Sequence, residues 1–97
     1  MSTHPQPPAL AAFAAQLGTA FAVSEPNSIS LQLSEAVPLN SAAPDERQFS
    51  LMFRGPAEAP LQQATHTLDH AVLGTLAIFL VPVGRDAAGM QYQAIFN

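Results

Sequence analysis

The chain has 97 residues, of which 48% are hydrophobic and only 10% are charged, and it contains no cysteine. A chain of this length forms one domain around one core, and the missing cysteines exclude disulfides, thiolate nucleophiles and cysteine-ligated zinc. A net charge of −4 with three scattered arginines argues against binding to nucleic acid or anionic lipid. Because few charges cover a large surface, we expect part of that surface to lie against a protein partner or a second copy of the chain.

The first residues predict neither a leader sequence nor a fixed structure. Residues 1–7 are polar and proline-rich, so we expect a disordered start followed by a single β-rich domain over 8–97. Residues 5–24 are uncharged, but prolines stand where a signal peptide requires basic residues. The uncharged residues 71–84 are too few to span a bilayer. We therefore expect cytoplasmic synthesis without a signal peptide, and no insertion into membranes.

A short helix is the first predicted element, over residues 8–17. Pro8 suits the first helical turn, and Gly18 suits the position after the last one. Apolar side chains recur at helical spacing, at Leu10, Phe13, Ala14 and Leu17.

After Gly18 the apolar residues alternate with polar ones, which is typical of strands with one face in a core. Turns or loops are predicted at 25–28, at 38–47 and after Gly55, where proline, glycine and acidic residues gather. The strands are predicted around Phe21 and Val23, over 29–34, 49–53, 61–70, 75–83 and 90–97.

Residues 75–83 are apolar on both faces, which predicts a strand that is covered on both sides by the N-terminal helix or by a neighbouring subunit. Pro82 predicts an edge or a bulge, and 84–89 a hairpin loop. The chain is therefore predicted to be mainly β: a small antiparallel β-barrel or curled sheet of about six strands, with one short N-terminal helix.

Catalytic and metal-binding patterns are weak in this sequence. His66 and His70 are spaced to share a metal on a helix, but on a strand they lie about 13 Å apart. Ser50, His66 and Asp69 supply the residue types of a triad without a nucleophile motif. No glycine-rich nucleotide loop is present. We predict no enzyme, no cofactor and no metal.

A protein interface is the more specific hypothesis, with Arg54, Phe79, Val81 and Pro82 as candidate residues. Arg54 stands at the end of a predicted strand, where arginine is either an interface anchor or a surface residue paired with Glu58 or Asp69. Phe79 lies on the two-sided apolar strand, so its face could lie against the helix or a partner.

The second half of the chain resembles a family of small uncharacterised bacterial proteins. The resemblance rests on FSLMFRGP (49–56), PLQQATHTLDH (60–70), LGTLAIFLVPVG (73–84) and YQAIFN (92–97). The family pattern has tyrosine where this chain has His66, and residues 77–79 also vary from it. The resemblance implies no assigned activity, and its association with phage-tail-collar-like genes implies a role in assembly or as an adaptor.

Two function classes follow from the sequence. The first is a non-enzymatic structural or protein-interaction module, an accessory of a phage-tail-like or fibre-like assembly. The alternative is a small barrel that binds an apolar or sugar-like ligand in its mouth, in a pocket lined by residues such as Phe53, Leu68, Phe79 and Tyr92.

Overall fold

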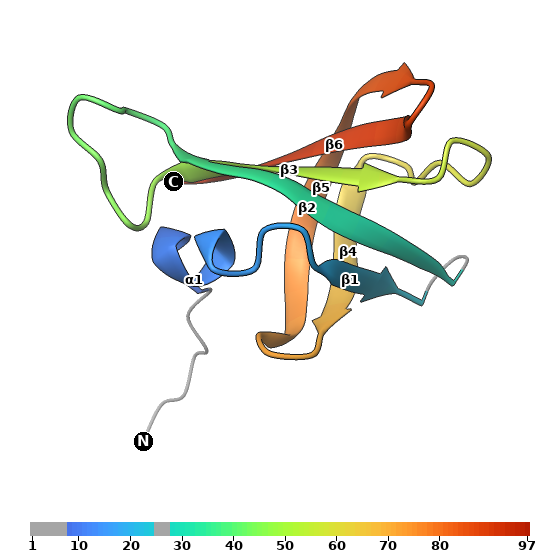
Figure 1. Ribbon diagram of the computed structural model, residues 1–97, viewed down its shortest axis with the longest axis horizontal. Helices are drawn as coiled ribbons and strands as arrows, with labels where there is room; N and C mark the ends of the chain where they lie inside the picture. Colours follow the sequence, from blue (N-terminus) through green and yellow to red (C-terminus); the bar gives the residue numbers. More distant parts are fainter. Residues whose placement is uncertain (1–7, 25–27) are drawn as a thin grey trace.

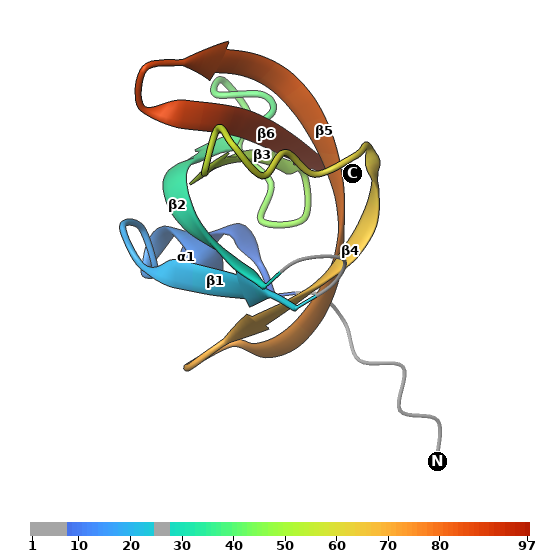
Figure 2. The same cartoon turned by 90° about the vertical axis from the view of Figure 1, so that its right-hand side faces the viewer.

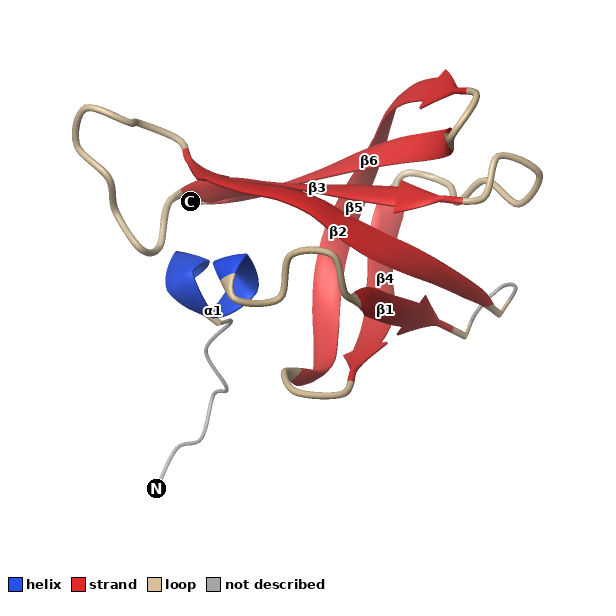
Figure 3. Ribbon diagram, in the orientation of Figure 1, coloured by secondary structure: helices blue, strands red, loops and turns tan. Residues whose placement is uncertain are grey.

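The computed structural model describes residues 8–24 and 28–97, which form one short helix and six strands around an apolar core (Figures 1 and 3). The predicted mainly β class with a short helix near the N-terminus is confirmed, while residues 1–7, predicted to be disordered, lie outside the described residues. In chain order the elements are α1 (Leu10–Ala14), β1 (Ala20–Val23), β2 (Ile29–Pro38), β3 (Phe49–Gly55), β4 (Ala64–His70), β5 (Gly74–Asp86) and β6 (Gly89–Phe96).

The six strands close into an antiparallel barrel in the order β1–β2–β3–β6–β5–β4 (Figure 2). Closure depends on two long strands that change neighbours along their length. β2 pairs first with β1 and then with β3, and its register shifts between Leu33 and Glu35. β5 pairs first with β4 and then with β6, and its register shifts between Pro82 and Gly84. Such bulges increase the local twist and bend the strand, which brings the two ends of the sheet together.

The barrel interior is filled by side chains that alternate along the strands, as the period of two predicted. Every strand and the helix contribute at least one fully buried side chain, and each stabilises the fold by roughly 1.5–3 kcal/mol. Phe21 and Phe53 meet edge to face with ring centroids 5.3 Å apart. The largest fully buried side chains are Tyr92, Phe13, Phe21, Phe49, Phe53, Leu31, Leu33, Leu51, Leu68, Leu80 and Val23.

Helix α1 plugs one end of the barrel and is shorter than predicted. The fully buried ring of Phe13 has its centroid 5.7 Å from the ring centroids of Phe49 and Phe96. The helix ends at Ala14, because the chain then turns to meet the sheet and the Gly18 amide donates to a β2 carbonyl oxygen at 2.8 Å. The tertiary contact with β2 therefore overrides the helical spacing of the last predicted turn.

Strand β5 is longer than predicted, and the helix does not cover its outer face. The strand continues to Asp86, so residues 84–89, predicted as a loop, contribute to both strands of a hairpin. Pro82 lies at the bulge, in agreement with the predicted edge or bulge. Helix α1 packs against β2, and Phe79 on β5 is 50% exposed. The predicted cover by the helix is wrong, because the helix closes the end of the barrel instead.

Tyr92 holds the segment before β4 from inside the barrel. The ring of Tyr92 is fully buried, and its hydroxyl oxygen accepts a 2.8 Å hydrogen bond from the Leu61 amide. The Leu61 side chain is also buried, so this segment docks on the core instead of extending the strand. β4 consequently begins at Ala64, later than the predicted start at residue 61.

His70 is a second polar anchor. Its Nδ1 accepts hydrogen bonds from the amides of Val72 and Leu73 at 3.0 and 3.1 Å, so this nitrogen carries no proton. Nε2–H donates to Oγ1 of Thr19 at 2.8 Å, and the imidazole packs against Phe21 with a centroid distance of 4.3 Å. One side chain thus ties the β4–β5 turn to the segment that precedes β1.

Tyr92→Phe is expected to lower the free energy of unfolding by about 1–3 kcal/mol, because the buried Leu61 amide loses its acceptor. The phenylalanine keeps the packing of the ring, so the loss measures the hydroxyl alone. Urea unfolding followed by circular dichroism checks the value. A variant as stable as the wild type would show that the hydrogen bond contributes nothing.

Gly89→Ala is expected to lower the free energy of unfolding by about 2–4 kcal/mol. Gly89 has a φ of 128°, and a Cβ atom there would overlap the carbonyl oxygen of Gly55. Gly74→Ala is the matched control, because Gly74 has a φ of 79° but open space where its Cβ would lie. Equal losses for the two variants would contradict the close approach as the cause.

Candidate functional site

The outer side of β5 exposes an aromatic ring on a regular strand. Side chains alternate along β5, so its leucine and isoleucine residues face the core while Ala77, Phe79 and Val81 face outward. On the neighbouring β4, Thr65 pairs with Phe79 and Thr67 pairs with Ala77. We call Thr65, Thr67, Ala77, Phe79 and Val81 the β5 outer face.

The β5 outer face carries no charged side chain. Strands β5 and β6 have charges only at Arg85 and Asp86, beside their shared hairpin turn. On β4, Asp69 lies at the margin of the face, on the same side of the sheet, and accepts a 2.6 Å hydrogen bond from Oγ1 of Thr75. An uncharged patch around an exposed aromatic ring is typical of a surface that lies against a protein partner.

The predicted interface residues do not all lie together. Phe79, Val81 and Pro82 follow one another along β5, with Pro82 half-buried opposite Tyr92. Arg54 lies on β3 near the β5–β6 hairpin, and its Nη1 is 3.4 Å from Oδ1 of Asp86. This partner differs from the Glu58 or Asp69 predicted for a surface arginine, because the hairpin folds over the end of β3. The structure thus places Arg54 at the rim of the β5–β6 hairpin, away from Phe79.

Strand β5 also has one edge without a neighbouring strand, a feature that the sequence analysis missed. Residues 74–80 pair with β4, but pairing with β6 begins only at Val81. β6 diverges there and follows β3 as far as Phe96, and Figure 1 shows the two strands separating. Alternate peptide groups of a strand point to its two sides. Within the described residues, those of 74–80 that point away from β4 have no strand beside them.

The histidines and the serine that the sequence offered for chemistry have separate partners. Nε2–H of His66 donates to the Gln62 carbonyl at 2.8 Å, whereas His70 belongs to the buried network. Oγ of Ser50 on β3 accepts a 3.1 Å hydrogen bond from Nε2 of Gln93 on the neighbouring strand β6. Two strands separate β3 from β4 in the barrel, so Ser50 does not join His66 in a triad. In the ranges 8–24 and 28–97, no cluster of three or more potential metal ligands is found.

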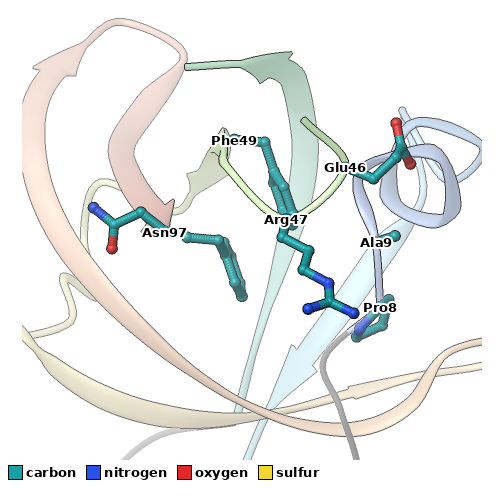
Figure 4. Close-up of a pocket in the computed structure, with 7 residues that line it drawn as sticks. Pro8, Ala9, Glu46, Arg47, Phe49 and Asn97 are labelled. Atoms are coloured by element: carbon teal, nitrogen blue, oxygen red, sulfur yellow. The ribbon is translucent and has the colours of Figure 1, made fainter. Parts of the chain in front are cut away.

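A pocket of about 370 Å³ lies beside the helical plug (Figure 4). Phe49 and Phe96 stack in it with centroids 4.6 Å apart and an interplanar angle of 14°. Oε1 of Glu46 accepts a 2.8 Å hydrogen bond from the helix, whereas the Arg47 guanidinium has no ion-pair partner among the residues that the structure describes. The lining residues are Pro8, Ala9, Glu46, Arg47, Phe49, Phe96 and Asn97.

This pocket is not the one that the sequence predicted. Phe53, Leu68 and Tyr92 are fully buried in the filled interior, and Phe79 lies outside the barrel. The four residues therefore do not line one cavity, because the core side chains occupy the space that a ligand would need. The observed pocket is built instead from the ends of β3 and β6, which are distant in sequence and adjacent in the sheet.

Comparison with known families decides where the chain belongs. A family model described as a domain of unknown function, DUF6916, matches residues 8–96. The chain belongs to the DUF6916 family. The match includes the helix and all six strands described above, so in this member the DUF6916 domain is a closed barrel with a helical plug. No curated protein and no solved structure matches this DUF6916 chain.

Among the described residues of this DUF6916 domain, no helix combines the length and the hydropathy that crossing a bilayer requires.

Proposed function

We propose that this chain is a non-enzymatic structural or protein-interaction module, and that it associates with copies of itself through the β5 outer face. The observation that carries the proposal is the half-exposed ring of Phe79 within an uncharged patch. Burying an aromatic side chain removes a large apolar area from water, and aromatic residues dominate the energetics of interfaces.

The distribution of charge supports a second copy as the partner. The chain has a net charge of −4, so two copies repel each other where their acidic surfaces meet. Strands β5 and β6 are uncharged from Gly74 to Gly84 and from Gly89 to Phe96. Two copies that approach through the β5 outer face bring uncharged side chains together, with Asp69 of each copy at the margin, and their apolar side chains match in kind.

The filled interior also directs attention to the surface. Side chains from all six strands fill the interior of the barrel. Its outer wall therefore remains as a surface for binding. An accessory of a phage-tail-like or fibre-like assembly contacts its neighbours through its surface, and the β5 outer face is a surface of that kind. The gene association of the family that the sequence resembles is in line with that role.

Phe79→Asp is expected to weaken self-association about 30-fold or more, which corresponds to roughly 2 kcal/mol for a central aromatic residue. Light scattering coupled to size-exclusion chromatography, over a range of concentrations, measures the change. Phe79 is half exposed, so the variant is expected to keep the circular dichroism spectrum of the wild type.

Val72→Asp is the matched control, because Val72 is 70% exposed in the β4–β5 turn and outside the β5 outer face. This variant adds the same charge and is expected to associate like the wild type. A wild type that stays monomeric at every concentration would refute the proposed function. Equal weakening by both variants would refute the β5 outer face as the contact.

The pocket beside the helical plug favours a second candidate function, the binding of a small apolar ligand that carries one anionic group. The stacked rings of Phe49 and Phe96 offer an apolar wall, and the guanidinium of Arg47 offers the matching charge. Glu46 also lines the pocket, and its carboxylate accepts a hydrogen bond from the Ala11 amide, whereas it forms no ion pair with Arg47. The volume of about 370 Å³ suits a ligand with a single ring.

Titration with benzoate, followed by amide chemical shifts, is expected to perturb Arg47 and Asn97 with millimolar affinity, as befits a ligand of this size. Benzamide has the same shape without the charge and is expected to bind about 5-fold more weakly, and Arg47→Gln is expected to abolish this difference. Equal binding of benzoate and benzamide by the wild type would contradict the role of the arginine.

A further inference from the structure

We infer that residues 74–80 of β5 pair edge to edge with the same residues of a second copy, which continues the sheet from one barrel into the next. This inference rests on the proposed self-association and names its geometry. It concerns the backbone of β5, whereas the proposed function was argued from the side chains of the β5 outer face.

The unpaired peptide groups of β5 specify what kind of surface can cover them. Pairing with β4 uses one edge of residues 74–80, and pairing with β6 does not start before Val81. The helix packs against β2 and does not supply a partner for this edge. Backbone N–H and C=O groups at a strand edge are satisfied best by another extended strand. The complementary surface is therefore a strand edge and not a helix or a flat apolar face.

Residues 74–80 lack the features by which proteins protect a strand edge. The segment GTLAIFL contains no charge and no proline, and the nearest proline is Pro82, where pairing with β6 has already begun. Charged side chains and prolines are the usual means of preventing pairing between edges. A second strand can pair with an edge that lacks them. Every solution of this protein contains other copies of the chain, so an identical strand is always present.

The sequence of the segment is complementary to itself in one antiparallel register. A two-fold axis at Ala77 sets this residue beside the partner's Ala77, and it sets Phe79 beside the partner's Thr75. A large aromatic ring then lies next to a small β-branched side chain, which is a favourable cross-strand pair. On the inner face, Leu76 lies beside the partner's Ile78, so apolar residues meet apolar residues across the axis. A two-fold contact uses the same surface on both copies and closes as a dimer.

The absence of cysteine from the chain permits a sharp test with single cysteine variants. In the inferred register, two Ala77 Cα atoms lie about 4.5–5.5 Å apart, which is within the range of a disulfide. Thr67 is the matched control, because it pairs with Ala77 on the neighbouring strand and is also exposed. Thr67 and the partner's Thr67 would lie three strand spacings apart, about 14 Å, which is too far for a disulfide.

Under mild oxidation, Ala77→Cys is expected to form a covalent dimer at least about 10-fold faster than Thr67→Cys, because strand pairing raises the effective concentration of the thiols. In the wild type, hydrogen exchange of alternate amides in 74–80 is expected to slow as the protein concentration rises. A wild type that dimerises while the two variants cross-link at equal rates, with exchange in 74–80 unchanged, would overturn the edge pairing and leave the proposed function intact. A monomeric wild type would overturn both.

Discussion

The bend of β5 between Pro82 and Gly84 is the constraint on which the rest of the structure depends. Residues 74–80 of the strand pair with β4, and residues 81–86, which contain the bend, pair with β6, so one strand joins both halves of the barrel. Proline cannot donate to a ladder, and a bulge is a place where a sheet tolerates that loss. Because pairing with β6 begins only at Val81, residues 74–80 have no second neighbouring strand among the described residues, and Phe79 on this segment faces outward. The change of neighbour along β5 thus takes part in closing the barrel and also leaves one edge of the candidate contact strand exposed.

Three polar or steric contacts hold the loops to this bent barrel. Tyr92 accepts the Leu61 amide from inside, His70 joins the β4–β5 turn to the start of β1, and Gly89 approaches the backbone of Gly55 where β3 meets β6. Each anchor acts within the core or at its margin, where a filled interior leaves no room for a ligand. The places that remain for recognition are the outer wall of β5 and the pocket beside the helical plug.

The proposed self-association along β5 would relate the composition of the chain to its fold. A closed barrel normally removes free strand edges, and a small domain normally covers its surface with charges. Among the described residues, 74–80 have one edge without a neighbouring strand and carry no charge, and a charged side chain on the neighbouring β4, Asp69, lies opposite Thr75. The proposed pairing would give this edge a partner and would set Phe79 beside the partner's Thr75, which relates the low charge of the segment to the contact between copies.

The sequence by itself determined the alternation of apolar residues and therefore the strands, the side chains of the core and the bulge near Pro82, because these depend on spacing within one segment. It left open which face of residues 75–83 is inside, since both faces are apolar. Only the tertiary structure decided that Ile78 faces the core and Phe79 the outside, that Arg54 pairs with Asp86, and that β6 leaves β5 at Val81. The reason is physical: the period of a strand is local, whereas its neighbours are set by where distant strands bend and pair.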